Sequence, residues 1–300
     1  MNTGNPEKKV KRTSGAGGAA WKEGGMRLLC LTAACVSVLA VFLICLFLFA
    51  NGIPAMGEIG ISEFLTGQTW MPNNDIYGIL PMILGSVYVT AIAALIGVPV
   101  AVLTSVFMVF YCPRRLYGAL HGGISLMAGI PSVVYGFFGL VVLVPAFKKL
   151  LGLPNGNTML TAAVLLGIMI LPTVIGVIEP ALRSVPESYY EGALALGASH
   201  TRAIYFVTVP AAKSGIIAGL VLGIGRAVGE TMAVIMVAGN QARMPKGILT
   251  GIRTMTANIV LEMGYASGLH REALIATGVV LFVFILVINL SVSVLYRRKQ

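Results

Sequence analysis

Charged side chains are scarce in this chain, and their scarcity argues against a soluble globular domain. Only 11% of the 300 residues are Asp, Glu, Lys or Arg, whereas 57% are hydrophobic. A soluble domain carries about 25% charged residues. The mean hydropathy of +0.89 is typical of an integral membrane protein.

Sequence motifs for several kinds of chemistry are also missing. No lysine follows a glycine, which excludes the Gly-Lys-Ser/Thr phosphate loop of an ATPase. There is no His-Glu-x-x-His, and the three histidines have no partner at metal-ligand spacing. The four cysteines lack such spacing as well. We therefore expect no catalytic residue and no metal site, and no basic-aromatic patch suits nucleic acid.

What the chain does contain is a series of long apolar segments. Each is close to the length that a membrane-spanning helix needs, about 20 residues. The first is too long for the apolar part of a signal peptide, about 7–15 residues, so we expect an uncleaved anchor. The predicted fold class is all-α, a polytopic membrane protein with six transmembrane helices. The six segments lie at roughly 28–50, 79–111, 118–146, 157–179, 214–239 and 272–296.

The placement of Lys and Arg predicts the orientation. Residues 1–27 are polar, Gly-rich and basic, and we expect a disordered cytosolic tail there, with a second cytosolic tail at 297–300. The loop 51–78 has no Lys or Arg and is expected outside. Both termini are then cytosolic and 79–296 forms the main transmembrane domain, although the predicted external loop 240–271 is weakly basic. The net charge of +10 thus reflects topology, with contact to anionic membrane lipid as a secondary consequence.

The stretch GRAVGETMAV, residues 225–234, places two charges inside the fifth apolar segment. Arg226 lies roughly 18 Å along that helix, near the bilayer midplane, where an arginine costs about 2.5–3.5 kcal/mol. Glu230 follows at i+4 and is expected on the same helix face. One interpretation is a structural ion pair that fixes packing. The other is an anion path, in which Arg226 binds a passing oxyanion and Glu230 holds the arginine when the path is empty.

Three further residues are candidates for the same path. Thr231 is the weakest, because a hydroxyl inside a membrane usually bonds a carbonyl of its own helix. Pro131 must disturb the third segment and free backbone carbonyls. Ser132 could satisfy one of those carbonyls, and Ser132 and Tyr135 are also candidates to line the path. Close helix packing is predicted by glycines repeated every four residues, at 215, 219 and 223 and again at 225 and 229.

The connection between the fourth and fifth segments predicts a helical hairpin. Ser184 to Glu187 has the form of a capping box that opens a helix over about 185–196. Gly197 supplies the backbone freedom for a sharp turn. A second helix over about 199–207 is expected to end before Pro210.

This connection resembles the EAA loop of ABC-importer permeases. Glu191-Gly192-Ala193 is followed by Gly197 and then by Val207-Thr208-Val209-Pro210, with the spacing of that loop. The chain departs from the pattern with Gly192 for Ala, Val207 for Ile and Val209 for Leu. The resemblance implies the architecture of a type I ABC-importer permease. It also implies a coupling loop, 184–210, that contacts a separate ATPase dimer through Glu191, Ala193, Gly197 and Pro210. ATP and Mg would bind that partner, and this chain would need no cofactor.

Two stretches narrow the resemblance to phosphate ABC-transporter permeases of the PstC type. GRAVGETMAVIMVAGN (225–240) is similar to their fifth span and GIPSVVYGFFGL (129–140) to their third, within a similarity that runs from about 76 to 296. It implies phosphate passage past Arg226 and Glu230, in the inner membrane. The partners would be a second, PstA-like permease subunit and an extracytoplasmic phosphate-binding protein.

Three alternatives stay open. The first is the same kind of permease with another oxyanion, molybdate or sulfate. The second is a secondary anion transporter that works without an ATPase, which would need inverted repeats or coupling carboxylates near the midplane. The third is an intramembrane enzyme, which would need a nucleophile and base or metal ligands within the spans.

Overall fold

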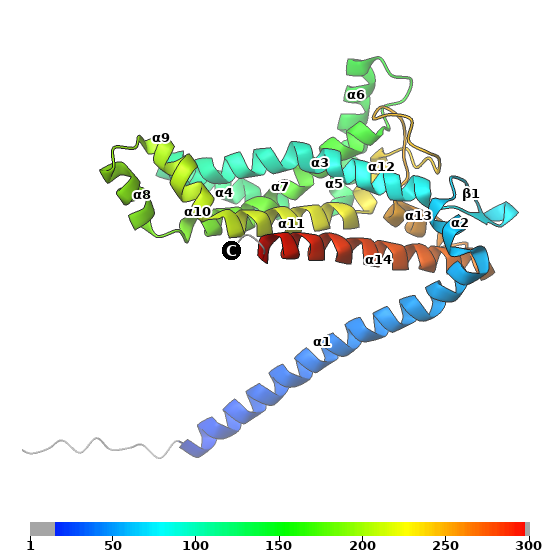
Figure 1. The fold of residues 1–300 in the computed structure, drawn as a ribbon, viewed down its shortest axis with the longest axis horizontal. Coiled ribbons are helices and arrows are strands. Elements are labelled where there is room, and N and C mark those ends of the chain that lie inside the picture. The colour runs from blue at the N-terminus through cyan, green and yellow to red at the C-terminus, as the bar shows by residue number, and fades with distance from the viewer. Residues whose placement is uncertain (1–15, 298–300) are drawn as a thin grey trace, which may run out of the picture. The chain divides into compact units, whose positions relative to one another are not determined.

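The computed structural model describes residues 16–297, and it consists mainly of helices (Figure 1). The chain divides into two compact units, residues 1–50 and 51–300. Helix α1, Ala16–Ile59, begins within the segment that was expected to be a disordered tail. Residues 1–15 and 298–300, which hold most of the two predicted tails, lie outside the described residues.

The first apolar segment is part of a longer helix than the sequence predicts. Within the first unit, the side chains of α1 from Gly25 onward are almost all exposed and apolar, a surface suited to hydrocarbon. The helix continues past Pro54 to Ile59. Tertiary packing explains this extension: a Cβ at Gly52 would lie 2.6 Å from Cγ2 of Val279 on α14 (Gly268–Arg297). Close packing on α14 thus holds the helical conformation where Gly and Pro disfavour it.

The predicted external loop 51–78 is largely structured. After α1 the chain forms the short helix α2, Ile61–Thr66, and the strands β1, Trp70–Met71, and β2, Ile76–Tyr77. The strands pair antiparallel with Trp70 opposite Tyr77, and the 3₁₀ turn η1, Pro72–Asn74, connects them. This β-hairpin places two large aromatic side chains next to each other.

Helices make up most of the second unit after the hairpin. The longest are α3 (Leu80–Val106), α7 (Met159–Arg183), α11 (Lys213–Gly229) and α14. Shorter helices are α4 (Arg114–Gly129), α5 (Ser132–Phe138), α6 (Val144–Leu151), α8 (Glu187–Ala195), α9 (His200–Ala203), α10 (Val209–Ala211), α12 (Met232–Val237) and α13 (Met255–Glu262). Three π-helical turns continue α3, α5 and α9: η2 (Phe107–Tyr111), η3 (Gly139–Leu143) and η4 (Ile204–Thr208).

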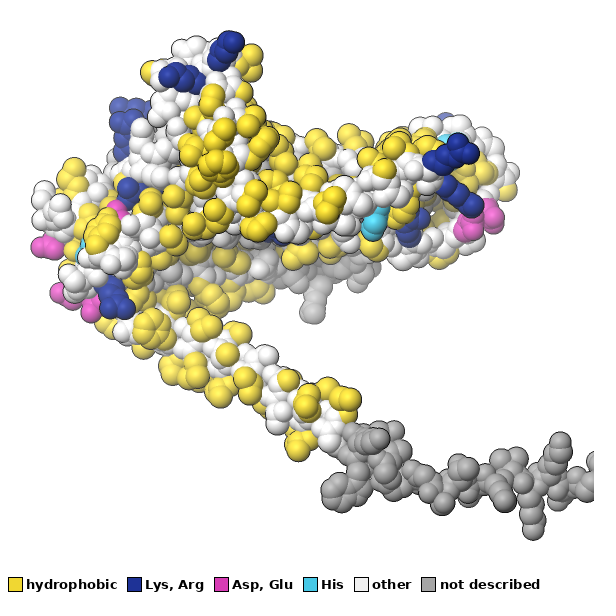
Figure 2. Space-filling model, turned by 180° about the vertical axis from the view of Figure 1, so that it is seen from behind, with side chains coloured by type: hydrophobic (Ala, Val, Ile, Leu, Met, Phe, Trp, Pro, Cys, Tyr) yellow, Lys and Arg dark blue, Asp and Glu magenta, His cyan; other side chains and the backbone are white. Residues whose placement is uncertain are grey.

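The number of apolar helices agrees with the predicted fold class. Among the described residues, five helices are long and apolar enough to cross a membrane. A sixth crossing results if the segments 200–211 and 213–229, bent by 68° to each other, form one span. In Figure 2 the charged side chains of the second unit gather toward its two ends, with hydrophobic side chains between them. This distribution is the one that a hydrocarbon layer requires.

Two of the predicted spans are broken in the structure. The break expected at Pro131 is confirmed: α4 ends at Gly129, Ile130 has extended backbone angles, and α5 begins at Ser132. Proline has no N–H and disfavours a helical residue before it, which explains the break. The prediction of one continuous fifth span over 214–239 is wrong, because α11 ends at Gly229 and α12 starts only at Met232.

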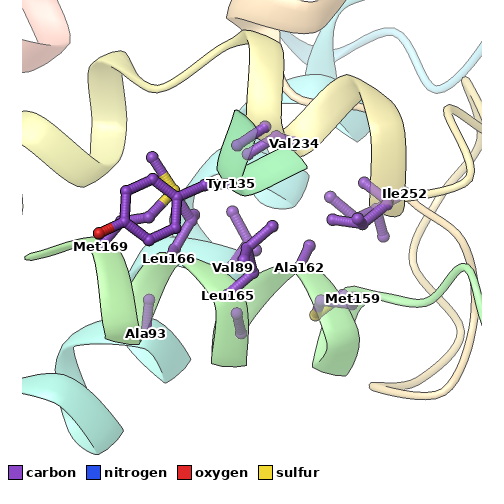
Figure 3. Close-up of a cluster of buried hydrophobic side chains, with 14 of the residues drawn as sticks. Val89, Ala93, Tyr135, Met159, Ala162, Leu165, Leu166, Met169, Val234 and Ile252 are labelled. Carbon is purple, nitrogen blue, oxygen red and sulfur yellow. The ribbon is translucent and has the colours of Figure 1, made fainter. Parts of the chain in front are cut away.

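Helix α7 lies at the centre of the fold and packs most extensively on α3 and α11. Figure 3 shows one cluster of buried side chains around it, with Val89 and Ala93 on α3, Leu165 and Met169 on α7, and Val234 on α12. These side chains are at most 3% exposed. Van der Waals packing between the helices stabilises this cluster. The hydrophobic effect contributes little to helix association in a membrane, because the lipid tails are as apolar as the side chains.

The first predicted glycine stripe is confirmed as a packing surface. A Cβ at Gly215 would lie 2.1 Å from Cβ of Ala181, and one at Gly223 would lie 2.4 Å from Cγ2 of Val174, both on α7. A Cβ at Gly219 would meet α7 in the same way. The second pair differs, because no described atom would lie within 4 Å of a Cβ at 225 or 229. The small residues at 215–223 therefore allow α11 and α7 to approach at backbone distance.

Candidate functional site

Arg226 projects from α11 into a groove in the second unit. It lies roughly 20 Å from the start of α11 at Lys213, given a rise of 1.5 Å per residue. Its Nη1 donates a hydrogen bond of 3.2 Å to Oγ1 of Thr173 on α7. None of the ion pairs among the described residues includes Arg226. The guanidinium is therefore a cation in apolar surroundings without a paired carboxylate.

The groove has a volume of about 790 Å³ and lies between α11, α14 and the middle of α7. Its walls are mainly aliphatic side chains and small residues of α11. Four polar side chains also line it: Thr173, Ser214, Arg226 and Asn289. Polar groups inside membrane spans are costly, and they commonly mark ion or substrate pathways.

Glu230 does not pair with Arg226, so the predicted shared face is wrong. Its backbone is extended, with φ −68° and ψ 130°, because the helix has already ended at Gly229. Its Oε1 accepts a hydrogen bond of 3.2 Å from the N–H of Ala233, in the first turn of α12. Its carbonyl accepts from Thr256 Oγ1 at 3.1 Å. The i+4 spacing sets a common face only within a continuous helix, and here the helix is interrupted.

The other predicted path residues do not line the groove. Thr231 donates to the carbonyl of Gly229 at 3.2 Å, a bond within its own segment, as expected of a membrane hydroxyl. The Tyr135 hydroxyl donates to the carbonyl of Met127 at 2.9 Å, across the break at Pro131. Tyr135 thus satisfies a carbonyl near the end of α4, whereas half-buried Ser132 makes no side-chain hydrogen bond among the described residues. Of the five predicted path residues, only Arg226 faces this groove.

The predicted helical hairpin is present at the end of the second unit that bears α8 and α9 (Figure 1). Gly197 forms the turn with φ +84°, a left-handed conformation that glycine adopts without strain. Glu191 is exposed on α8 and Ala193 is buried. Exposed apolar side chains accompany them, with Leu196 91% and Phe206 75% exposed. Such a surface is suited to a protein partner.

Two details of this hairpin differ from the prediction. The capping box is wrong: Ser184 Oγ donates to the carbonyl of Ala181, and Pro186 occupies the position before α8. Ser199 instead caps the second helix by accepting from the N–H of Arg202. That helix also does not end before Pro210 but continues to Ala211. The proline directly follows the π-helical turn η4, a local departure from the regular α-helical bonding in which a missing N–H is accommodated.

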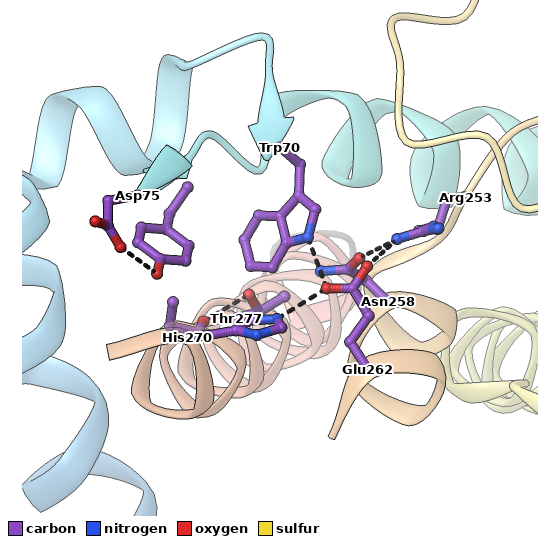
Figure 4. A network of polar contacts seen from close by, with 9 residues as sticks. Trp70, Asp75, Arg253, Asn258, Glu262, His270 and Thr277 are labelled. Atoms are coloured by element: carbon purple, nitrogen blue, oxygen red, sulfur yellow. Dashed lines mark hydrogen bonds and ion pairs between the residues drawn. The ribbon is translucent and has the colours of Figure 1, made fainter. Parts of the chain in front are cut away.

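A polar network at the opposite end of the second unit was not predicted (Figure 4). Glu262 at the end of α13 is only 7% exposed. Its carboxylate accepts from Trp70 Nε1 and from His270 Nε2, each at 2.9 Å, and it forms an ion pair with Arg253. Arg253 donates further to the side chain of Asn258 at 3.0 Å. The network ties the β-hairpin, α13 and the start of α14 together.

The protonation of Glu262 follows from this network. Burial by itself would raise the pKa of the Glu262 carboxyl. Hydrogen bonds from Trp70, His270 and Arg253, together with the charge of Arg253, outweigh burial and lower that pKa below its ordinary value of 4.5. The carboxylate is therefore ionised at neutral pH, and Arg253 is neutralised by it. This pairing accounts for one basic residue of the loop that departs from the positive-inside pattern.

A second network surrounds Glu179 near the end of α7. Its Oε1 accepts from the Tyr117 hydroxyl of α4 at 2.6 Å and from Arg183 at 3.1 Å. The Arg183 guanidinium also lies 5.0 Å from the centre of the Tyr117 ring. These contacts fix α4 to the end of α7 from which the helical hairpin starts.

Sequence reasoning missed Glu179 and Glu262 for different reasons. Glu179 and Arg183 carry a usable signal, because opposite charges at i and i+4 pair on a helix. The partners of Glu262 are far from it in the sequence, 192 residues in the case of Trp70, so no local pattern predicts them.

Among the described residues no group of three His, Cys, Asp or Glu side chains is arranged to hold a metal ion.

Comparison with protein families matches residues 97–300 to the binding-protein-dependent transport system inner membrane component family. The chain is also 36% identical over 280 residues to a probable ABC transporter permease protein, YqgH, of Bacillus subtilis, with 91% of each chain covered. It is 35% identical over 256 residues to the phosphate transport system permease protein PstC of Mesorhizobium japonicum, covering 79% of this chain and 78% of that one. A probable PstC of Methanocaldococcus jannaschii is 32% identical over 295 residues, covering 91% and 93%.

Solved structures with a similar fold come from ABC transporters. A bacterial alginate ABC transporter in complex with an alginate-bound periplasmic protein aligns with a TM-score of 0.63 at 19% identity, covering 93% of this chain and 97% of that one. The inward-facing MetNI methionine ABC transporter aligns with a TM-score of 0.59 at 17% identity, covering 77% and 100%. At these identities the likeness extends to the fold alone.

Proposed function

Because the chain belongs to the family of binding-protein-dependent transport system inner membrane components, we propose that it is the permease subunit of an ATP-driven phosphate importer. It is an integral membrane permease component, and ATP hydrolysis takes place on a separate subunit. The cargo assignment is supported by relatives at 32–35% identity that are named phosphate permeases. The single observation in the structure that supports it most is the unpaired Arg226 guanidinium in the groove of α11 and α14.

An anion needs such a group to cross the membrane. An isolated charge in a dry interior of low dielectric costs tens of kcal/mol by idealised Born estimates. The guanidinium fork of Arg226 matches the geometry of phosphate oxygens and stays charged throughout the cycle. Because no carboxylate among the described residues is paired with it, an arriving anion does not have to displace a competing ion pair. This chain would supply one side of the path, and a second, PstA-like permease subunit the other.

The helical hairpin is the proposed contact with the ATPase dimer, which would hold ATP and Mg. Exposed Glu191, the turn at Gly197 and the exposed apolar side chains of Leu196 and Phe206 form a surface on which a partner can bury apolar area. Closure of the dimer on ATP binding would move this hairpin, and hydrolysis would return it. An extracytoplasmic phosphate-binding protein would deliver the cargo at the end that bears the β-hairpin.

Orientation is part of the proposal, with both termini in the cytosol and the β-hairpin outside. Ser62 on α2 and Arg115 at the start of α4 are both exposed, so cysteines there are accessible probes. In a background without the four native cysteines, a membrane-impermeant maleimide should label Ser62→Cys in intact cells. Arg115→Cys should react only after the cells are opened. The reverse pattern would invert the topology.

The decisive experiment reconstitutes the whole complex into liposomes and measures uptake of labelled phosphate with ATP supplied on the ATPase side. Arg226→Ala should abolish uptake while the subunits still co-purify. Arg226→Lys keeps the charge but loses the fork, and it should retain partial uptake. If Arg226→Ala prevents assembly, Arg226 has a structural role only.

Two alternatives are outcomes of the same assay. Excess unlabelled sulfate or molybdate that competes as well as phosphate would assign the permease to another oxyanion. Uptake driven by an ion gradient without the ATPase would indicate a secondary transporter. Neither alternative has a specific observation in its favour.

A further inference from the structure

Thr173 occupies an unusual position beside the guanidinium of Arg226. It lies in the middle of α7, directly after Pro172, and is half-buried. Its Oγ1 accepts the hydrogen bond from Arg226 Nη1 at 3.2 Å, which joins two helices across 53 residues of sequence. It also lines the groove. The groove therefore presents a hydroxyl and a guanidinium side by side.

The hydroxyl of Thr173 differs from other hydroxyls in the described apolar helices, because it does not donate a hydrogen bond to a carbonyl of its own helix. Thr104 and Ser105 on α3, and Thr277 on α14, each donate to the carbonyl four residues earlier in their own helix. The Thr173 hydroxyl makes no such bond within the described part of the chain; its contact there is the one with Arg226. A hydroxyl has one donor and two acceptor positions. Because Thr173 accepts from Arg226, its proton remains available to an acceptor in the groove.

The unpaired positive charge of Arg226 and the donors around it determine which kind of ligand the groove can bind. A guanidinium has five N–H donors and no acceptor, and one of the five is used by Thr173. Together the two side chains offer several donors, and no ion pair of the described residues places a carboxylate on Arg226. Ile217, Val221 and Ile285 form apolar walls nearby. The ligand that such a site fits is a compact anion with several acceptor oxygens.

We propose that Thr173 and Arg226 together form a binding station for a tetrahedral oxyanion, in which Thr173 both holds the guanidinium and donates its own hydroxyl proton to the anion. The inference rests on the proposed function, because inorganic phosphate in transit is the occupant to which it commits. A phosphate group of an anionic lipid shares the chemistry of inorganic phosphate. The test has to separate these two sources.

The bond to Thr173 also positions the exposed side chain of Arg226. An arginine side chain has many rotamers, and fixing it costs conformational entropy. The bond to Thr173 restrains the guanidinium on the α7 side of the groove before an anion arrives. Preorganisation of this kind strengthens binding because less ordering remains to be done. Thr173 is thus a positioning residue for Arg226 as well as a ligand of the anion.

The experiment compares Thr173→Val, which removes the hydroxyl at nearly constant shape, with Thr173→Ser, which retains it. Thr104→Val is the matched control, because it removes a hydroxyl that bonds only its own helix. In proteoliposomes of the whole complex with the binding protein, we measure phosphate uptake and ATP hydrolysis together. Loss of one charge-assisted hydrogen bond should lower uptake by Thr173→Val about tenfold, with ATP hydrolysis within about twofold of the parent. Thr104→Val should transport like the parent, and Thr173→Ser should transport clearly more than Thr173→Val because it keeps the hydroxyl.

The outcomes separate this inference from the proposed function. If Arg226→Ala abolishes uptake but Thr173→Val transports normally, the station is wrong and the importer stands. If the parent complex takes up no phosphate, the proposed function fails. If the parent and Arg226→Ala transport phosphate equally well, the importer stands and the station is wrong. Equal loss in Thr173→Val and Thr173→Ser, or an equal fall of uptake and ATP hydrolysis, would indicate a packing role and overturn the station. The lipid arm repeats the assay in phosphatidylcholine vesicles with and without phosphatidylglycerol; a Thr173→Val defect seen only with phosphatidylglycerol would assign the site to lipid.

Discussion

The network around Glu262 makes a quantitative prediction for Arg253→Met. The substitution keeps the length of the side chain and removes its charge. Glu262 then remains buried with Trp70 and His270 as partners, but without its ion pair. Breaking a buried pair by removing one partner costs about 3–5 kcal/mol, because the remaining charge is uncompensated. We expect the stability of the region between the β-hairpin and α13 to fall by this amount.

Trp70 provides the readout, because its indole donates directly to Glu262. With Trp21 replaced by Phe, fluorescence of Trp70 during titration of the purified chain with denaturant reports the opening of this region. Glu58→Gln is the control, because Glu58 is exposed and none of the ion pairs of the described residues includes it. It should change stability by less than about 0.5 kcal/mol. The double variant Arg253→Met/Glu262→Gln should recover part of the loss, since neither charge is then left alone. An Arg253→Met variant as stable as Glu58→Gln would refute the reasoning.

The same network predicts the pH dependence. The pKa of Glu262 is lower in the folded protein than its ordinary value of 4.5, so the ionised form is favoured by folding. Its contribution is complete above about pH 4.5 and is lost as the pH falls through the lowered pKa. The parent protein should therefore lose stability below about pH 4.5 by the Trp70 assay. Glu262→Gln should lack this part of the acid dependence, and an identical acid profile in both would contradict it.

Two further predictions concern glycines. Gly215→Ala should destabilise the chain by about 1–3 kcal/mol in thermal unfolding, because its Cβ would lie 2.1 Å from that of Ala181 and neither can rotate away. Ala181→Gly should restore stability in the same molecule, and Gly225→Ala, with no atom within 4 Å, should be neutral or stabilising. Gly197→Val should weaken co-purification of the ATPase, because a β-branched residue is strained at φ +84°. Gly192→Ala on the adjoining helix should leave co-purification unchanged, and equal retention by both variants would argue against the hairpin contact.

The membrane architecture was largely predictable because it depends on local properties. Apolar length places every span except the interrupted fifth, and the chemistry of Pro131 and Gly197 places a break and a turn. The spacing of four between the glycines at 215, 219 and 223 predicts that they form a packing surface. Each of these features is decided by residues within one or two helical turns.

The site was predictable only in part, because its geometry depends on contacts that spacing does not encode. Arg226 was recognisable because a charge inside an apolar segment is energetically costly. The position of Glu230 was not, because α11 ends at Gly229 and Glu230 therefore does not share a helix face with Arg226. Ser132 was predicted to satisfy a carbonyl freed at Pro131, but it is the Tyr135 hydroxyl that bonds the carbonyl of Met127. Nothing in the sequence distinguishes Thr173 from other threonines in apolar helices, since they usually bond their own backbone. Its role depends on a partner from another helix.

The glycine stripe between α11 and α7 also has a mechanical consequence. Two helices whose backbones touch along three successive turns have little freedom to slide or tilt against each other. A motion that starts at the helical hairpin must then move α7 and α11 together as one rigid body. Bending is left to the interruptions at residues 130–131 and 230–231, where the backbone is already extended or irregular. Spin labels placed on α7 and α11 should keep one separation in every nucleotide state, while pairs that bracket either interruption should change.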